Sequence, residues 1–320
     1  MPPEILLTGP VLPNVASNLN TSFRVHEVWK LGGLPALPAE LRSNMRAVVG
    51  AGHDPIGAEF FDLLPALEIV ASIGVGYEHI DAREAARRGI LVTNTPDVLT
   101  DEVADFAVGL LIATLRQLPQ ADRFVRAGRW QAGEFPLTST LRRRKIGIVG
   151  LGRIGRAVAH RLAAFGVSIA YHGRNPQAGV SYPYYSSLIA LARDVDTLVS
   201  VVPGGASTYH LITSDILEAL GPDGVVINVG RGSTIDERAL LAALKDGTIL
   251  SAGLDVFENE PHIPPEFLEL DRVVLLPHVG SGSVLTREAM GQLMIDNMRS
   301  WFEGNGPLTP VVETPWQRRK

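Results

Sequence analysis

The sequence contains no cysteine in its 320 residues, which excludes disulfides, thiolate metal sites and cysteine nucleophiles, and we expect no bound metal. It has no apolar run near the roughly 20 residues that a membrane span needs. The N-terminal stretch MPPEILLTGP lacks the basic residues that open a secretory signal peptide. Acidic residues outnumber basic ones, 34 to 29, which disfavours a nucleic-acid partner. These absences fit a cytoplasmic enzyme.

What is present points to a globular protein, with 46% apolar and 20% charged residues in a chain long enough for two domains. Short apolar runs alternate with helical patterns in the first part of the chain. We expect strands at Ile5–Gly9, Phe23–Trp29, Ala47–Gly50, Ile69–Gly74 and Ile90–Asn94. A helix before the last of these is indicated by Asp81 as N-cap, Glu84 three residues on and Gly89 as the stop.

A long apolar helix is predicted from Asp101 to about Leu118, with Thr100 as its N-cap. After a loop rich in glycine and aromatic residues, a second series of strands and helices begins. Its strands are expected at Ile146–Gly150, Ser168–His172, Thr197–Val202, Val225–Val229, Ser251–Val256 and Val273–Pro277, and a last helix near Val284–Glu303. Strands separated by helices predict an α/β fold with parallel sheets, and six such strands fit a doubly wound dinucleotide-binding domain.

The motif Gly150-Leu151-Gly152-Arg153-Ile154-Gly155 follows one of these strands and opens a helical run, which is the context that a dinucleotide fingerprint requires. Gly150 permits the tight turn, and Gly152 lets the backbone approach the pyrophosphate at the helix N-terminus. Gly155 lets the helix pack closely on the strand. The alternative is a tight turn with no ligand.

The next strand indicates which dinucleotide binds. NAD-binding domains carry an Asp or Glu about 20 residues beyond the fingerprint, which holds the ribose 2′-hydroxyl. Here the strand ends in Gly173, Arg174 and Asn175, with no acid in it. A carboxylate would repel a 2′-phosphate, whereas a guanidinium binds one with two hydrogen bonds. We therefore predict NADP(H) as the cofactor, with Arg174 on the 2′-phosphate and Gly173 and Asn175 beside it.

Four polar residues lie at or just beyond the ends of later predicted strands: Arg231, Asp255, Glu260 and His278. Open α/β sheets build their sites at the carboxyl ends of strands. Singly, each residue could be a solvated charge or a structural histidine. Together, around one crevice, they predict an anion clamp and an acid–base pair.

The motifs VGYEHID, GLGRIG, VGRG, GLDVFENEP and PHVGSGS resemble those of the D-2-hydroxyacid dehydrogenases, closest to the NADPH-dependent glyoxylate/hydroxypyruvate and hydroxyphenylpyruvate reductases. The resemblance runs from about Ile69 to the C-terminus. It implies two Rossmann-like domains: a discontinuous, smaller, flavodoxin-like substrate domain at 1–98 and 285–320, and a dinucleotide-binding domain at 99–284. It also implies a homodimer.

The resemblance also implies roles for individual residues. His278 would donate a proton to the ketone oxygen, Glu260 would orient its imidazole, and Arg231 would bind the substrate's carboxylate and carbonyl oxygens. The backbone N–H groups of Val75 and Gly76 would receive the carboxylate. Further cofactor contacts are implied for Thr100, Val202, Pro203, Val229, Asp255, His278 and Gly280.

The sequence therefore predicts reduction of a small 2-oxo carboxylate, such as glyoxylate or hydroxypyruvate, with NADPH. The substrate's tail is expected near Gly50–His53, Tyr77 and Trp130. Two alternatives stay open: an NAD-linked dehydrogenase that oxidises a 2-hydroxyacid, as phosphoglycerate dehydrogenase does, and a dinucleotide-sensing corepressor that binds partners without depending on turnover. Formate oxidation is disfavoured because its enzymes pair the histidine with Gln, whereas phosphite oxidation is excluded only weakly.

Overall fold

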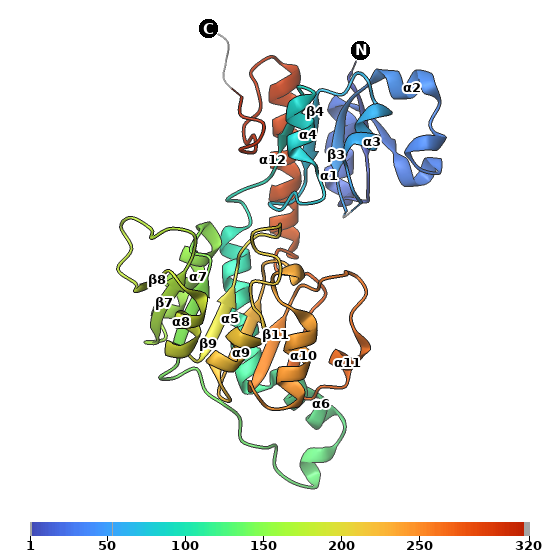
Figure 1. Ribbon diagram of the computed structural model, residues 1–320. Coiled ribbons are helices and arrows are strands. Elements are labelled where there is room, and N and C mark those ends of the chain that lie inside the picture. The colour runs from blue at the N-terminus through green and yellow to red at the C-terminus, as the bar shows by residue number, and fades with distance from the viewer. Residues whose placement is uncertain (1, 53, 317–320) are drawn as a thin grey trace. The chain divides into compact units, whose positions relative to one another are not determined.

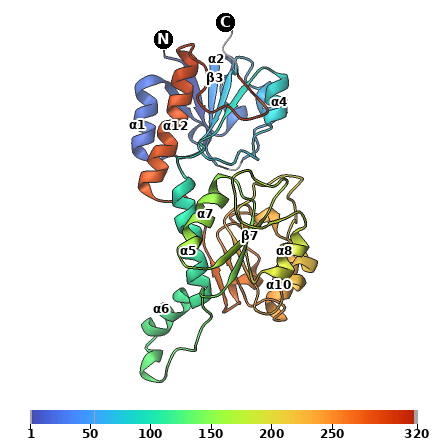
Figure 2. The ribbon, with the colours of Figure 1, turned by 90° about the vertical axis from the view of Figure 1, so that its left-hand side faces the viewer.

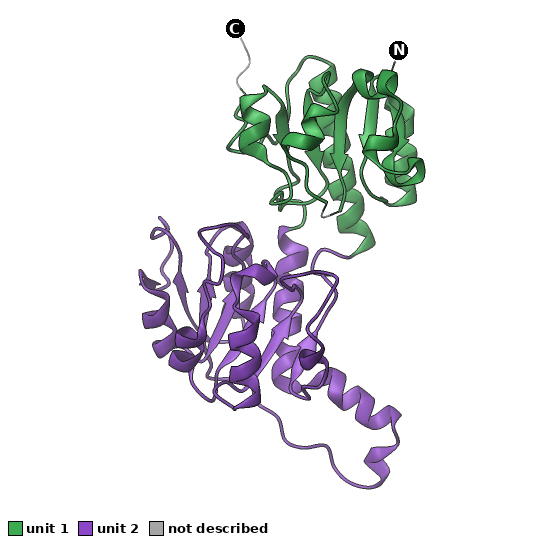
Figure 3. Cartoon of the chain, turned by 45° about the vertical axis from the view of Figure 1, so that its right-hand side comes forward, with its two compact units in different colours: residues 1–99, 283–320 green, residues 100–282 purple. Residues whose placement is uncertain are grey.

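A computed structural model describes residues 2–52 and 54–316. The chain forms two compact units, Met1–Leu99 with Ser283–Lys320 and Thr100–Gly282 (Figure 3). Each unit is a parallel sheet with helices on both faces, so the predicted fold class is confirmed. Among the described residues, no helix is both long enough and apolar enough to cross a membrane.

The first unit is built on a sheet of five parallel strands in the order β2-β1-β3-β4-β5, which is the flavodoxin-like order. Its strands are β1 (Glu4–Leu7), β2 (Arg24–Glu27), β3 (Met45–Gly50), β4 (Ile69–Ser72) and β5 (Leu91–Thr93). Its helices are α1 (Pro13–Ser22), α2 (Ala39–Asn44), α3 (Ala58–Asp62), α4 (Ala82–Arg87) and α12 (Val284–Phe302). The helices α1 and α12 lie side by side over one face, and their apolar side chains share a core with β1, β3 and β4 (Figure 2).

The second unit contains seven parallel strands in the order β12-β11-β10-β9-β6-β7-β8 (Figure 1). They are β6 (Lys145–Val149), β7 (Ser168–His172), β8 (Tyr184–Tyr185), β9 (Thr197–Ser200), β10 (Val225–Asn228), β11 (Ser251–Leu254) and β12 (Val273–Leu275). The helices are α5 (Thr100–Arg116), α6 (Leu118–Arg126), α7 (Arg153–Ala163), α8 (Leu188–Asp194), α9 (Ser214–Leu220), α10 (Glu237–Lys245) and α11 (Pro265–Leu268). Helices α5 and α7 cover one face, and α8, α9 and α10 cover the other. The strand order reverses between β6 and β9, as in a dinucleotide-binding domain.

Five local predictions are corrected by the structure. Strand β2 ends at Glu27, because Val28–Leu31 form a 3₁₀ turn that leads into two glycines with positive φ. Thr100 is the first residue of α5 rather than its cap, and α5 ends at Arg116 because Gln117 adopts a left-handed φ of 50°.

The other two corrections concern elements that the sequence pattern did not reveal. The segment predicted as a loop after α5 contains α6 and a 3₁₀ turn at Arg129–Gln131. Helix α6 has no buried residue among those described, and its apolar side chains Leu118 and Val125 are exposed. The second sheet also has a seventh strand, β8, which is only two residues long and pairs with β7.

The strand register aligns the carboxyl ends of the second sheet. Val149 of β6 and Asn228 of β10 both pair with Ser200 of β9, and Leu254 of β11 pairs with Asn228 and with Leu275 of β12. The loops that follow β6, β9, β10, β11 and β12 therefore begin at the same edge of the sheet. This edge carries most of the predicted site residues.

Gly253 of β11 lies where α5 packs closely on the sheet. A Cβ at Gly253 would overlap the Thr114 hydroxyl and would lie 3.0 Å from Leu110 Cγ, both on α5. We expect Gly253→Val to lower the free energy of unfolding by about 1–3 kcal/mol, because the side chain forces helix and strand apart. Urea unfolding of the purified protein measures this change.

Gly109 provides the matched control on the same helix, since no atom lies within 4 Å of the position that its Cβ would take. Gly109→Ala should leave stability unchanged or raise it by up to about 1 kcal/mol. A Gly253→Val protein as stable as the wild type would contradict the close packing.

Candidate active site

The glycine fingerprint forms the turn between β6 and α7. Gly150 has a φ of +97°, and a Cβ there would lie 2.6 Å from Val202 Cγ1. A Cβ at Gly155 would overlap the carbonyl oxygen of Gly150. Apart from its own neighbours in the chain, no described residue comes within 4 Å of the Cβ position of Gly152, so the backbone at the start of α7 is open on that side. A helix N-terminus approachable in this way fits a pyrophosphate.

The end of β7 is held by the neighbouring strand β8. His172 Nδ1 is 2.9 Å from the carbonyl oxygen of Tyr185, and the Tyr184 hydroxyl donates to the carbonyl of Gly173 at 3.1 Å. These contacts fix the backbone just before Arg174 and Asn175, whose side chains are exposed. An exposed guanidinium on a fixed backbone, with no acid in the strand, fits a 2′-phosphate.

The turn after β10 is fixed by Asn228, whose Oδ1 accepts from the Gly230 N–H at 3.0 Å and whose Nδ2 donates to the Arg231 carbonyl at 2.9 Å. The Thr234 hydroxyl donates to the same carbonyl at 2.7 Å. Arg231 Nη1 donates to the carbonyl of Gly230 at 2.7 Å. The Arg231 backbone is therefore held by side chains of its own loop.

The two glycines of VGRG let this turn lie close to its neighbours. A Cβ at Gly230 would lie 2.5 Å from the carbonyl oxygen of Val202, and one at Gly232 would overlap the backbone of Phe257. The loops after β9, β10 and β11 are thus in backbone contact at the edge of the sheet. Arg231 is carried by the middle one of the three.

Asp255 ties the loop after β12 to the end of β11. Asp255 is buried, with only 1% of its surface exposed. Its two side-chain oxygens accept hydrogen bonds from the backbone N–H groups of Val279 and Gly280, each at 2.8 Å. The N–H of His278 donates to the Asp255 carbonyl, also at 2.8 Å. Burial raises the pKa of Asp255, while the two N–H donors and His278 oppose the rise. Asp255 thus holds three successive residues of the loop.

His278 and Glu260 form a hydrogen-bonded pair. Nδ1 of His278 is 2.7 Å from Oε2 of Glu260, and Oε1 of Glu260 accepts from the N–H of Phe257 at 2.9 Å. An ionised carboxylate only accepts, so Nδ1 carries the hydrogen in this pair. The Nε2 position is then the one at which the imidazole can hold or release a proton toward a ligand.

Glu237, which belongs to none of the predicted site motifs, holds the backbone of the loop that leads to Glu260. It is buried at the start of α10, and its Oε1 accepts from the N–H of Glu258 at 2.8 Å. Burial raises the pKa of Glu237, and the nearby carboxylates of Glu258 and Glu260 add to the rise. In the sequence Glu237 looks like an ordinary acid at a helix N-terminus, because burial cannot be read from that position.

Glu237 makes the stability of the fold depend on pH. Because its pKa is raised above the usual 4.5, the folded protein holds this proton more tightly than the unfolded chain. Its contribution to stability is therefore present at low pH and is lost as the pH rises through the raised pKa. We expect Glu237→Gln, which keeps an acceptor oxygen but carries no charge, to lose less stability between pH 4.5 and neutral pH than the wild type.

Chemical denaturation at a series of pH values measures this difference. Glu237→Ala serves as the control, since it removes the acceptor of the Glu258 N–H and should destabilise the protein by about 1–3 kcal/mol at all of these pH values. Parallel pH profiles for Glu237→Gln and the wild type would show that the buried carboxyl is not responsible.

The predicted carboxylate-binding turn belongs to the first unit, directly after β4. Val75 and Gly76 are half-buried, and within the described part of the chain their N–H groups donate to no acceptor. The hydroxyl of Tyr77 donates to Glu313 at 3.0 Å, and burial together with this carboxylate raises the pKa of Tyr77 to about 12. Tyr77 therefore stays protonated at neutral pH. His53 lies outside the described residues.

The other predicted residues occupy varied positions. In the second unit, Leu151 is buried in the core below the fingerprint, Arg153 and Ile154 open α7, and Thr100 opens α5. Val202 and Pro203 follow β9, Val229 follows β10 and Gly280 follows His278. Trp130 is 67% exposed in the segment after α6.

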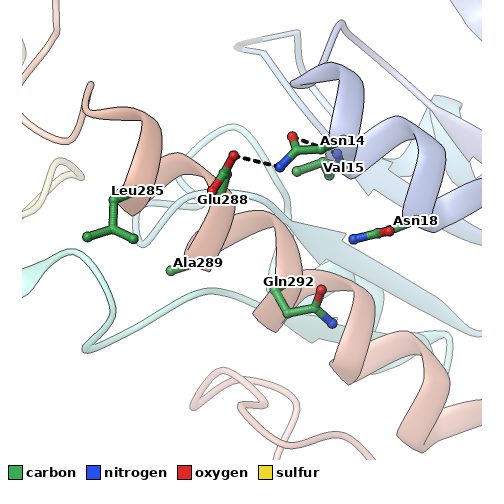
Figure 4. A pocket seen from close by; sticks show the side chains of 7 residues that line it. All are labelled: Asn14, Val15, Asn18, Leu285, Glu288, Ala289 and Gln292. Atoms are coloured by element: carbon green, nitrogen blue, oxygen red, sulfur yellow. Dashed lines mark hydrogen bonds between the residues drawn. The ribbon is translucent and has the colours of Figure 1, made fainter.

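A separate hollow lies in the first unit, between α1 and α12 (Figure 4). It is lined by Asn14, Val15, Asn18, Leu285, Glu288, Ala289 and Gln292. Asn14 Nδ2 donates to Glu288 across it at 2.7 Å. None of the predicted site residues lines this hollow, and its single acid is already paired with an amide, so we do not assign the chemistry to it.

Comparison with known proteins identifies the family. Residues 108–280 match the D-isomer specific 2-hydroxyacid dehydrogenase, NAD binding domain. That segment contains the glycine fingerprint and the loops that carry Arg231, Glu260 and His278. The chain belongs to the D-isomer specific 2-hydroxyacid dehydrogenase family, and the predicted resemblance is confirmed.

Similar proteins match over nearly the whole chain. A hydroxyphenylpyruvate reductase from Plectranthus scutellarioides and a glyoxylate/hydroxypyruvate reductase from Arabidopsis thaliana are each 44% identical over 308 residues, 96% of this chain and 98% of the relative. Among solved structures, an NADPH-dependent glyoxylate/hydroxypyruvate reductase from Sinorhizobium meliloti, in complex with NADP and malonate, is 50% identical. It has a TM-score of 0.95 and covers 100% of both chains.

Proposed function

We propose that this protein reduces small 2-oxo carboxylates, with glyoxylate and hydroxypyruvate as the leading substrates, to D-2-hydroxyacids at the expense of NADPH. The observation that carries the proposal is the 2.7 Å contact between His278 and Glu260, at the edge of a sheet that also bears a dinucleotide fingerprint and Arg231. Similarity to glyoxylate/hydroxypyruvate reductases over nearly all of the chain supports it.

The second unit has the features that a dinucleotide needs. The N-terminus of α7 at Gly152 would receive the pyrophosphate, and Arg174 would bind the 2′-phosphate with help from Gly173 and Asn175. NADPH, when bound, supplies the hydride. That a solved relative with 50% identity is NADPH-dependent supports this choice of cofactor.

His278 would act as the acid. Glu260 accepts from Nδ1 and so fixes the ring and its tautomer, which leaves Nε2 to donate its proton to the substrate's ketone oxygen. The loop that carries His278 is held by Asp255, so the ring has little freedom to turn away. In the reverse direction the same nitrogen would take the proton from the hydroxyl.

Arg231 and the turn at Val75 and Gly76 would bind the carboxylate. A guanidinium offers two parallel donors to a carboxylate, and successive backbone N–H groups form a concave anion site. Arg231 would also stabilise the negative charge that develops on the ketone oxygen. The first unit would thus be the substrate-binding domain and the second the cofactor-binding domain.

We further propose that the protein is a homodimer that works in the cytoplasm. Helix α6 and the segment after it expose Leu118, Val125 and Trp130, three large apolar side chains on an arm that extends from the second sheet (Figure 1). A second copy of the chain would cover such an apolar surface.

The proposed location in the cytoplasm is compatible with the lack of cysteine, since the cytoplasm is a reducing compartment.

Oxidation of NADPH with a panel of 2-oxoacids tests the function. We expect wild-type protein to oxidise NADPH with glyoxylate and hydroxypyruvate, and His278→Ala to lose at least about a hundredfold in kcat, because general acid catalysis contributes that much. NADPH binding should persist in the variant, since His278 is not among the phosphate-binding residues. His160→Ala, at an exposed position on α7, is the control and should behave as the wild type. Turnover by His278→Ala at the wild-type rate would refute the role of His278.

Arg174→Asp tests the cofactor. Two charge-assisted hydrogen bonds are lost and a repulsive charge is introduced, so the KM for NADPH should rise roughly tenfold to a hundredfold while that for NADH falls or stays constant. Arg193→Asp makes the same change of charge at an exposed position on α8 and should not shift the preference. Unaltered discrimination between NADPH and NADH in Arg174→Asp would exclude Arg174 as the 2′-phosphate ligand.

A further inference from the structure

Three successive carbonyl groups of the turn that follows β4 accept hydrogen bonds from residues just after β5. The N–H of Thr95 donates to the carbonyl of Gly74 at 3.1 Å, and the hydroxyl of Thr95 donates to that of Ile73 at 2.9 Å. The side-chain amide of Asn94 donates through Nδ2 to the carbonyl of Val75 at 2.7 Å. Two adjacent residues at the end of β5 thus hold three successive carbonyl groups.

Fixing a carbonyl also fixes the N–H on the same peptide unit. A trans peptide is planar, and its C=O and N–H point in opposite directions. The Gly74 carbonyl shares its peptide with the N–H of Val75, and the Val75 carbonyl shares its peptide with the N–H of Gly76. Thr95 therefore sets the direction of the Val75 N–H, and Asn94 sets that of the Gly76 N–H. Both N–H groups point away from β5 and donate to no described residue.

The end of β5 is itself braced by the C-terminal segment. The Thr309 hydroxyl donates to the Asn94 carbonyl at 2.6 Å, and the N–H of Asn94 donates to the Thr309 carbonyl at 3.3 Å. Thr309 is held in turn by the fully buried Asn297 of α12, with two hydrogen bonds of 2.9 Å. The backbone of Asn94 is thus fixed from the side opposite to the turn, which leaves its amide in a defined position.

We propose that Asn94 is a positioning residue for substrate binding: it aims the N–H of Gly76 at the carboxylate of the 2-oxoacid. This inference rests on the proposed function, since it requires that the turn receives a carboxylate. Of the two donors that hold the Gly74 and Val75 carbonyls, the Thr95 N–H belongs to the backbone, so Asn94 supplies the one that a side chain controls.

Loss of the Asn94 amide frees the peptide between Val75 and Gly76 to rotate. A rotated peptide presents the Val75 carbonyl oxygen where the N–H stood, and two oxygens repel each other. Asn94→Asp goes further, because an ionised carboxylate accepts only and opposes the Val75 carbonyl. Both changes act on carboxylate binding and leave the His278–Glu260 pair in the other unit intact.

The test compares Asn94→Ala and Asn94→Asp with the wild type in three measurements: KM and kcat for glyoxylate, the Kd for NADPH, and the Kd of the NADPH complex for oxamate, an unreactive isostere of pyruvate. We expect KM and the oxamate Kd to rise about tenfold in Asn94→Ala and more in Asn94→Asp. The change in kcat should be much smaller and the Kd for NADPH should stay constant.

Asn20→Ala is the matched control, since its amide also donates to a backbone carbonyl, that of Ala16 on the exposed side of α1. It should match the wild type in every measurement. If Asn94→Ala does not fold, Asn94→Ser replaces it, because the shorter side chain keeps a polar group but cannot reach the Val75 carbonyl.

The possible failures are distinguishable. If the wild type neither reduces glyoxylate nor binds oxamate, the proposed function fails and this inference falls with it. If the wild type does both and the Asn94 variants keep its KM and oxamate Kd, the inference alone is wrong. An equal loss in NADPH affinity, kcat and thermal stability would assign Asn94 a structural role and would also overturn it.

Discussion

The buried carboxylate of Asp255 is the constraint on which the site of the second unit depends. Burying a carboxylate is unfavourable unless hydrogen bonds replace water, and here the N–H groups of Val279 and Gly280 supply them. Those bonds tie the loop after β12 to the end of β11. His278 lies at the start of this loop with a φ of +54°, a left-handed conformation that a non-glycine residue adopts only when its surroundings hold it there. Glu260 then needs only to orient the ring.

In the proposed function both units would bind an anion through backbone N–H groups, but the two proposed sites are built differently. In the second unit, the start of α7 presents its N–H groups because a helix leaves its first donors without partners, and glycine keeps the approach open. In the first unit, the N–H groups of Val75 and Gly76 do not lie at the start of a helix. Their direction depends on the residues that hold the carbonyl groups of the same peptide units. The first kind of site can be predicted from a glycine motif. The second kind cannot, because it depends on residues at the end of a neighbouring strand.

This difference explains how much the sequence could predict. The fold class and the family followed from apolar strand runs and from the spacing of Gly150, Gly152 and Gly155, and both are confirmed. Helix α6 was not predicted because Pro119 and Gly128 border its nine residues and made the segment resemble a loop, and β8 was not predicted because a two-residue strand has no pattern. Glu237 and Asn94 were not predicted for another reason. Glu237 is hydrogen-bonded to the backbone of Glu258 and Asn94 to that of Val75, residues that are far away in the sequence. No local motif indicates such a bond.

The discontinuity of the first unit bears on the order in which the protein folds during its synthesis. Residues 100–282 are contiguous and can complete their core as soon as they leave the ribosome. The first unit cannot, because Met294, Ile295 and Met298 of α12 fill the core over one face of its sheet. Until α12 emerges, only α1 can cover the apolar residues of β1, β3 and β4 on that face. This face of the first sheet therefore stays incompletely covered until the last helix has been synthesised.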